Sequence, residues 1–310
     1  MRRALKIVAA LSMAMASSSA SVALAAEAPK PVSVPLMAWS NGHDTVPVFI
    51  NGVGPYPFIL DTGADGTAVY QWFADQIKLP KVEGADQDLS GQTGSSRVSM
   101  YRLDTLALGG VQKRIDQAYA LPARKDSGGQ AGVVGNDVMD DAVVVFDFPC
   151  RKVTIYPKPV DARSLAGPNA HALHTGVDEG STLLTFPVSL NGVTGTAILD
   201  SGSRQTRITQ GFARKAGIDP ASASFHDDAA IFGTSMNELV PRTGPVGELQ
   251  FAGMTLKNVT AQVIDLPVLL QDFHGEPAML VGADVLGRYR LVYDHAARNI
   301  WFDTSSCQSQ

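Results

Sequence analysis

Residues 58–64 read FILDTGA, and residues 197–203 read AILDSGS. In each stretch a short apolar run ends in an aspartate, a small hydroxyl residue and a glycine. Such a run is too short for a helix and is typical of a buried strand. The strand therefore delivers Asp61 or Asp200 at its end, and the following glycine permits a turn that a side chain would block. Because a carboxylate in that position is costly without a use, the two acids form a candidate dyad.

Both motifs lie at matching points of an internal repeat. Residues 46–53 (VPVFINGV) and 186–193 (FPVSLNGV) each read as strand, Asn-Gly hairpin turn, strand. After the motifs the copies stay in register, and residues 71–79 and 210–218 are expected to form short helices. The chain therefore holds two copies of one unit.

The words LDTGA and LDSGS resemble the active-site loops of aspartic proteases of the retropepsin-like and pepsin-like group. The resemblance extends through most of the mature chain. It implies an all-β fold of two pseudo-symmetric β-barrel lobes with short helices, in the bilobal arrangement of the pepsin-like enzymes. It also implies that Asp61 and Asp200 are catalytic. The loop residues that would support them are Thr62, Gly63, Ala64, Ser201, Gly202 and Ser203, with Thr62 and Ser201 interlocking the two loops by hydrogen bonds.

A dyad of this kind holds one proton, because two like charges a few ångströms apart do not both ionise easily. The charged carboxylate accepts a proton from a water that attacks the scissile carbonyl, and the protonated one donates to the carbonyl oxygen. No metal and no cofactor are required. Ala64 in one half and Ser203 in the other predict an asymmetric dyad, because only a hydroxyl can stabilise a carboxylate. We therefore expect Asp200 to ionise more readily than Asp61.

A polar, glycine-bearing stretch at 90–96 precedes the alternating residues 98–108 and predicts a β-hairpin. In the family such a hairpin is the flap that folds over an extended peptide substrate, which implies flap positions for Gly91 and Gly94. Tyr101 is either a flap or pocket residue or an ordinary strand aromatic. The counterpart in the second half, around 232–235, is less clear.

The first 25 residues have a basic start, an apolar run and a small-x-small site, which together predict a secretory signal peptide. We therefore expect export, either to the periplasm or outside the cell. No other segment approaches the length that a membrane span requires. Without these residues the chain loses three bases and no acid, so the formal charge falls from −5 to −8. An acidic surface argues against nucleic acid as a partner.

The domain organisation follows from the repeat. We expect a signal peptide at 1–25, an N-terminal extension at 26–44 that is a tail or an edge strand, a first domain at 45–157, a linker at 158–180, a second domain at 181–304 and a C-terminal tail at 305–310. The linker is rich in Pro, Gly and Ala, without a period. Its His171 and His174 have a helical metal-ligand spacing, but nothing nearby completes a site. Cys150 and Cys307 are either a disulfide or two thiols.

The leading hypothesis is an exported aspartic endopeptidase that acts on peptides or proteins bound in extended form. It would be a monomer with an internal pseudo-two-fold axis. Two alternatives remain: a peptide-binding or regulatory protein of the same fold without turnover, and a structural all-β envelope protein whose aspartates only cap turns. Cleavage that is sensitive to pepstatin distinguishes the first alternative, and an Asp61→Asn variant that loses stability rather than activity would identify the second.

Overall fold

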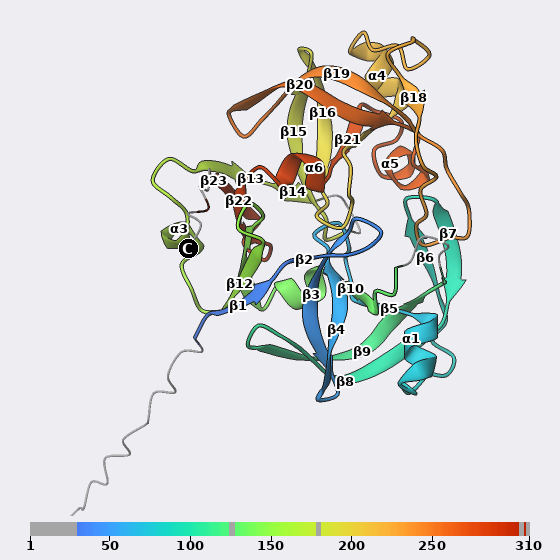
Figure 1. Cartoon of the computed structure of the whole chain (residues 1–310), viewed down its shortest axis with the longest axis vertical. Coiled ribbons are helices and arrows are strands. Elements are labelled where there is room, and N and C mark those ends of the chain that lie inside the picture. The colour runs from blue at the N-terminus through green and yellow to red at the C-terminus, as the bar shows by residue number, and fades with distance from the viewer. Residues whose placement is uncertain (1–29, 124–127, 178–180, 304–306, 308–310) are drawn as a thin grey trace, which may run out of the picture.

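Two β-barrel lobes share a third sheet in the computed structural model of the protein, which describes residues 30–123, 128–177, 181–303 and 307 (Figure 1). The expected signal peptide, 1–25, lies outside the described residues. Six strands close the first barrel because β8 pairs with both β9 and β3. In order around the barrel they are β3 (Asp44–Ile50), β4 (Val53–Leu60), β10 (Gly132–Val134), β5 (Ala68–Tyr70), β9 (Val111–Leu121) and β8 (Met100–Leu108), with β2 (Met37–Ala38) beside β3.

The second barrel repeats the first strand for strand. Its order is β15 (Leu184–Leu190), β16 (Val193–Leu199), β21 (Ala278–Val281), β17 (Arg207–Ile208), β20 (Met254–Val263) and β19 (Arg242–Phe251), with β14 (Gly176–Val177) and β18 (His226–Asp227) at its edges. Pairing of β15 with β19 closes this barrel. The expectation of a mainly β fold with two pseudo-symmetric barrels is confirmed.

The Asn-Gly turns form the hairpins that the sequence predicts. Asn51 and Gly52 have φ of 50° and 77°, and Asn191 and Gly192 have φ of 50° and 83°. Two successive residues at positive φ match the right-handed twist of the flanking strands. The second strand of each hairpin, β4 or β16, ends buried and runs directly into the aspartate loop.

The helices are short. They are α1 (Gln71–Gln76), α2 (Asn136–Met139), α3 (Ala162–Leu165), α4 (Gln210–Lys215), α5 (Pro267–Asp272) and α6 (Ala283–Leu286). The predicted helices at 71–79 and 210–218 occur as α1 and α4. Each ends earlier than predicted, because Lys78 and Gly217 take positive φ of 56° and 71°, as residues after a helix commonly do.

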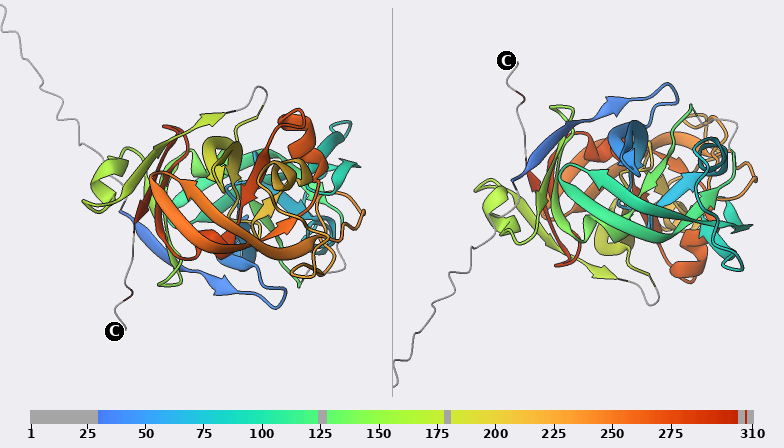
Figure 2. Two further views of the ribbon diagram at one scale, coloured as in Figure 1. Left: turned by 90° about the horizontal axis from the view of Figure 1, so that it is seen from above. Right: turned by 90° about the horizontal axis from the view of Figure 1, so that it is seen from below.

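The third sheet joins the lobes, and its two halves mirror each other, because each strand of the first half has an equivalent strand of the second half on the other side of the sheet centre. Its order is β1 (Val32–Pro35), β12 (Lys152–Pro157), β11 (Ala142–Asp147), β22 (Arg290–Asp294), β23 (Asn299–Asp303) and β13 (His171–His174). At its centre β11 and β22 pair antiparallel, for example Val144 with Tyr293. The edge strand β1 belongs to the N-terminal extension, and its counterpart β13 precedes the second barrel. Figure 2 shows the sheet at the end of the molecule that carries α3.

The described part of the expected linker, 158–180, contains α3, β13 and β14. The sequence pattern does not reveal β13, because Leu173 is its one buried residue and no alternation is visible. His171 and His174 are exposed on this strand, where residues three apart point to opposite faces. They therefore do not form a helical ligand pair.

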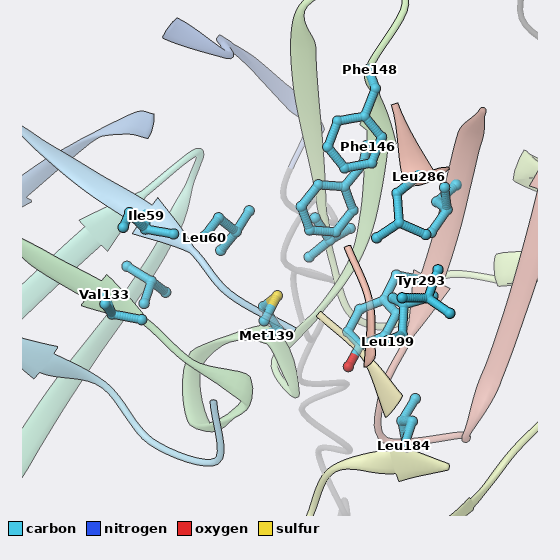
Figure 3. Packing of buried hydrophobic residues seen from close by; sticks show 14 of the residues in the cluster. Ile59, Leu60, Val133, Met139, Phe146, Phe148, Leu184, Leu199, Leu286 and Tyr293 are labelled. Atoms are coloured by element: carbon cyan, nitrogen blue, oxygen red, sulfur yellow. The ribbon is translucent and has the colours of Figure 1, made fainter. Parts of the chain in front are cut away.

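One hydrophobic cluster extends through both barrels and one face of the shared sheet. Figure 3 shows Leu60 of β4, Leu199 of β16 and Tyr293 of β22 packed around this region, with Phe146 of β11 beside Tyr293. The two motif strands thus end over a common core. Cys150, in the β11–β12 turn, and the exposed Cys307 are both thiols and not a disulfide.

Candidate active site

The two aspartate loops occupy equivalent places in the barrels and meet between the lobes. The Asp61 backbone N–H donates to the Val134 carbonyl at 3.0 Å, and the Asp200 N–H donates to the Val281 carbonyl at the same distance. Each loop is thus fixed to a strand of its own barrel, β10 or β21. The internal pseudo-two-fold axis brings Asp61 and Asp200 together.

Four hydrogen bonds cross from one loop to the other. The Thr62 hydroxyl donates to the Leu199 carbonyl at 2.9 Å and accepts from the Ser201 N–H at 3.0 Å. The Ser201 hydroxyl donates to the Leu60 carbonyl at 2.7 Å and accepts from the Thr62 N–H at 3.1 Å. This is the interlock expected from the resemblance.

The two motif glycines allow each loop to approach the opposite aspartate. A Cβ on Gly63 would lie 2.6 Å from the Asp200 Cγ, and one on Gly202 would overlap the Asp61 carboxyl. Backbone N–H groups also hold the carboxylates: Gly63 donates to Asp61 Oδ1 at 2.8 Å, and Ser203 donates to Asp200 Oδ1 at 2.7 Å. A side chain at either glycine would therefore force the opposite aspartate or the loop backbone to move.

A second layer supports each loop from below. Thr67 donates to the Asp137 carboxylate at 2.8 Å, and Thr206 donates to the Asp284 carboxylate at 2.7 Å. The loop carbonyls of Ala64 and Ser203 accept from the N–H groups of Asn136 and Ala283, at 2.9 and 2.8 Å. Helices α2 and α6, which begin at these residues, therefore fix the loop backbones.

Asn136 has a further role that Ala283 does not share. Its side-chain amide donates to the Thr62 carbonyl at 3.1 Å, and its Oδ1 accepts from the Tyr293 hydroxyl at 2.9 Å. Tyr293 belongs to the second half, so this chain of bonds crosses the axis beneath the dyad. Burial, and next the charges of Asp140 and Asp61, raise the Tyr293 pKa well above its usual value, so the phenol stays neutral.

The electrostatics of the dyad are those of a shared proton. Burial and the adjacent Asp200 charge raise the pKa of Asp61 well above its ordinary value of 3.8. Burial also raises the pKa of Asp200, but a hydrogen bond with Asp61 and the charge of Arg207 oppose that rise. The reason given for the predicted asymmetry is wrong: the Ser203 hydroxyl donates to the Gln205 carbonyl and accepts from Arg207, and only the Ser203 backbone N–H contacts the Asp200 carboxylate.

The predicted hairpin at 90–96 consists of β6 (Gln87–Gly91) and β7 (Gly94–Val98), with Gln92 and Thr93 at its tip. Gln92 was not singled out from the sequence. Its amide Nε2 donates to Asp200 Oδ2 at 3.1 Å, and its Oε1 accepts from Arg207. Gly91 and Gly94 flank the tip as expected, so this hairpin closes over the dyad.

In the second half, a folded-back segment, 231–239, lies where the sequence left the counterpart of this hairpin unclear, around 232–235. Only one bridge, Ile231 with Leu239, holds it in β form. It contacts the hairpin tip: the Ser235 hydroxyl donates to the Thr93 carbonyl at 2.8 Å, and the Thr234 hydroxyl donates to the Gly94 carbonyl at 2.9 Å. The hairpin and this segment together cover the dyad.

Tyr101 does not lie at the tip. It is buried in β8, and its hydroxyl accepts from the Gln71 amide at 2.7 Å, beside α1. A β8 residue lies at the base of the hairpin, where the chain has already entered the barrel wall. Tyr101 thus packs in the barrel wall as a strand aromatic, away from the hairpin tip.

Two barrels that each bring an Asp-Thr/Ser-Gly loop to one axis define the bilobal aspartic protease class. The chain belongs to the aspartyl protease family, whose model matches it twice, at residues 46–138 and 186–285. Each match spans one barrel and its motif. No curated protein matches the chain.

Within the described ranges, no group of three or more His, Cys, Asp or Glu side chains is placed to hold an ion. In the same part of the chain, no helix is long and apolar enough to cross a membrane.

Proposed function

We propose that the protein is an aspartic endopeptidase, in which Asp200 acts as the base and Asp61 as the acid. The observation that supports this most directly is the interlocked pair of loops, which juxtaposes two buried carboxyls whose pKa values are both raised by burial. A water between them would lose its proton to Asp200 as it attacks the scissile carbonyl. Asp61 would donate its proton to the carbonyl oxygen.

The substrate would be a peptide segment in extended form, lying between the dyad and the β6–β7 hairpin. Main-chain hydrogen bonds would hold it, and alternate side chains would enter pockets on either side. One chain supplies both halves of the site, so we propose a monomer. On the basis of the apolar N-terminal segment we propose that the protein is exported, to the periplasm or beyond.

Cleavage of a mixed peptide library by residues 26–310, from about pH 3 to pH 8, tests the activity. We expect pepstatin-sensitive cleavage that falls at least about 100-fold in Asp61→Asn and in Asp200→Asn, because each removes one half of the acid–base pair. Asp104→Asn, at an exposed position on β8, is the matched control. Full cleavage by either dyad variant would overturn the proposal.

A second candidate function is peptide binding without turnover. The observation in its favour is the Gln92 amide, which occupies the Asp200 oxygen that an attacking water would use. A folded protein that binds extended peptides and cleaves none of them at any pH would support this alternative.

A further inference from the structure

A buried arginine stands beside one aspartate of the dyad and has no equivalent beside the other. Arg207, in β17, is 4% exposed, whereas the matching position in β5 is Ala68. Transfer of a guanidinium from water into a protein interior is costly unless its donors and its charge are matched. A nearby negative charge would therefore offset the cost of burying the Arg207 guanidinium.

Arg207 reaches Asp200 through two bridging groups. Its Nη1 donates to the Ser203 hydroxyl at 2.7 Å and to the Gln92 side-chain carbonyl. The same two residues donate to the Asp200 carboxylate, Ser203 from its backbone N–H at 2.7 Å and Gln92 from its amide at 3.1 Å. The guanidinium thus polarises the Gln92 amide that holds Asp200 Oδ2, and it contacts the side chain of the residue whose backbone N–H holds Asp200 Oδ1.

A polar relay on the other side fixes the orientation of Arg207. Its Nε donates to Gln262 Oε1 at 2.8 Å, and Gln262 Nε2 donates to Asp228 Oδ2 at 3.0 Å. Partial burial would raise the pKa of Asp228, but hydrogen bonds from Thr243 and Gln262 lower it to about 2. This anion lies beyond Gln262, so the relay orients the guanidinium.

The other titratable groups around the dyad do not reproduce this effect. Asp61 faces Asp200 from the first loop and accepts from the Gly63 N–H. Asp284 accepts from the Thr206 N–H and hydroxyl, and Asp137 accepts from Thr67 below the first loop. The neutral Tyr293 phenol lies under the first loop, on Asn136. Arg207 is therefore the cation that distinguishes the two carboxyls.

We propose that Arg207 is a positioning residue that keeps Asp200 ionised and leaves the shared proton on Asp61. This inference rests on the proposed function, and it extends that function to the division of roles and the working pH. An adjacent arginine typically lowers a carboxyl pKa by about 1–3 units. Loss of its charge should therefore move the acid limb of kcat/KM to higher pH, because the dyad would take up its second proton more easily.

The direct test is carboxyl-carbon NMR titration of protein labelled with 13C-aspartate, with signals assigned from the Asp61→Asn and Asp200→Asn variants. In the unsubstituted protein we expect Asp200 to titrate below Asp61. In Arg207→Met its midpoint should rise by about one pH unit or more. Arg207→Lys, which keeps a charge at this position, should recover most of that difference. Arg214→Met, at an exposed residue of α4, should change neither midpoint.

The outcomes separate this inference from the proposed function. Asp61 titrating below Asp200 in the unsubstituted protein would overturn it, even if Arg207→Met does not fold. An unchanged Asp200 midpoint in folded Arg207→Met would do the same. Absence of peptide cleavage, with the expected titrations intact, would overturn the protease proposal and leave the role of Arg207 standing. In an active enzyme, the acid limb of kcat/KM should move with the NMR midpoint.

Discussion

At the scale of single residues, the dyad combines equivalent geometry with unequal chemistry. The two loops share their backbone anchors and their reciprocal Thr62 and Ser201 bonds. The difference arises around Asp200, which has Ser203, Gln92 and the nearby Arg207. The symmetric backbone contacts place both carboxyls, whereas the side chains around Asp200 influence which carboxyl holds the proton. Substitutions in the loop anchors should therefore change the position of the dyad, and substitutions around Asp200 should change its protonation.

The raised pKa of Asp61 has a consequence for stability. A folded-state pKa above 3.8 means that Asp61 holds its proton more tightly in the folded protein than in the unfolded chain. Its contribution to stability is therefore complete below pH 3.8 and is lost as pH rises through the folded pKa. Asp61→Asn, which cannot ionise, should lose less stability than the parent between pH 4 and pH 8.

Thermal unfolding across that range measures the difference. One pKa unit corresponds to about 1.4 kcal/mol, or about 3 °C in Tm for a chain of this size. The Tm advantage of Asp61→Asn should thus grow with pH, whereas that of the exposed Asp104→Asn should not. Parallel Tm curves for Asp61→Asn and the parent would contradict the raised pKa.

At the scale of elements, the β6–β7 hairpin and the 231–239 segment cover the dyad from opposite lobes. The hairpin is regular, whereas the opposing segment has little β structure and binds the hairpin tip through Ser235 and Thr234. Thr93 at the tip is 2% exposed. A substrate of the proposed kind would therefore have to displace the hairpin tip, and above all the Gln92 side chain, before it reached the dyad.

Gln92→Ala should lower KM for peptide substrates by up to about 30-fold, because the substrate no longer competes with two hydrogen bonds worth about 1 kcal/mol each. Steady-state kinetics on one peptide at several pH values give the measurement. Gln87→Ala is the matched control, since Gln87 lies on the same hairpin and bonds Gln117 on its outer side. A raised KM in Gln92→Ala would mean that Gln92 binds substrate instead of excluding it.

The sequence predicts the elements that occur in both copies of the internal repeat. The Asn-Gly hairpins, the motif strands and helices α1 and α4 recur in both halves, and each repeat reinforces the other. Gln92 and Arg207 are single, so no repeat marks them. One signal for Arg207 was visible: it interrupts the buried run after the second motif, where the first half has Ala68. The pairing of Gln92 with Asp200 depends on contacts between lobes, which no local pattern encodes.

At the scale of the whole molecule, the shared sheet and its core make the two lobes one cooperative unit. The sheet's central pair, β11 and β22, comes from opposite halves, and the hydrophobic cluster beneath continues into both barrels. The Tyr293 hydroxyl adds a polar connection through Asn136 to the first aspartate loop. We therefore expect the lobes to unfold together.

Tyr293→Phe tests this coupling. It leaves the buried Asn136 Oδ1 without its hydroxyl donor, which should cost about 1–3 kcal/mol. Urea unfolding followed by tryptophan fluorescence and by far-UV circular dichroism should show one shared transition at lower midpoint. Tyr156→Phe, a half-buried tyrosine of neighbouring β12, should change stability by less than about 0.5 kcal/mol. Two separate transitions in either protein would contradict a single unit.

The symmetric strand order of the shared sheet also suggests how the two halves of the chain arose. Matched strands β1 and β13, β12 and β23, and β11 and β22 are what a duplicated gene would leave if its ancestor paired two identical chains. In such a pair every substitution appears twice, so an arginine beside one aspartate would have a copy beside the other. Two cations would favour ionisation of both carboxyls and remove the proton that the acid must give. In a single chain, by contrast, Arg207 can stand beside one aspartate alone, so the two halves can differ in chemistry while they share a fold.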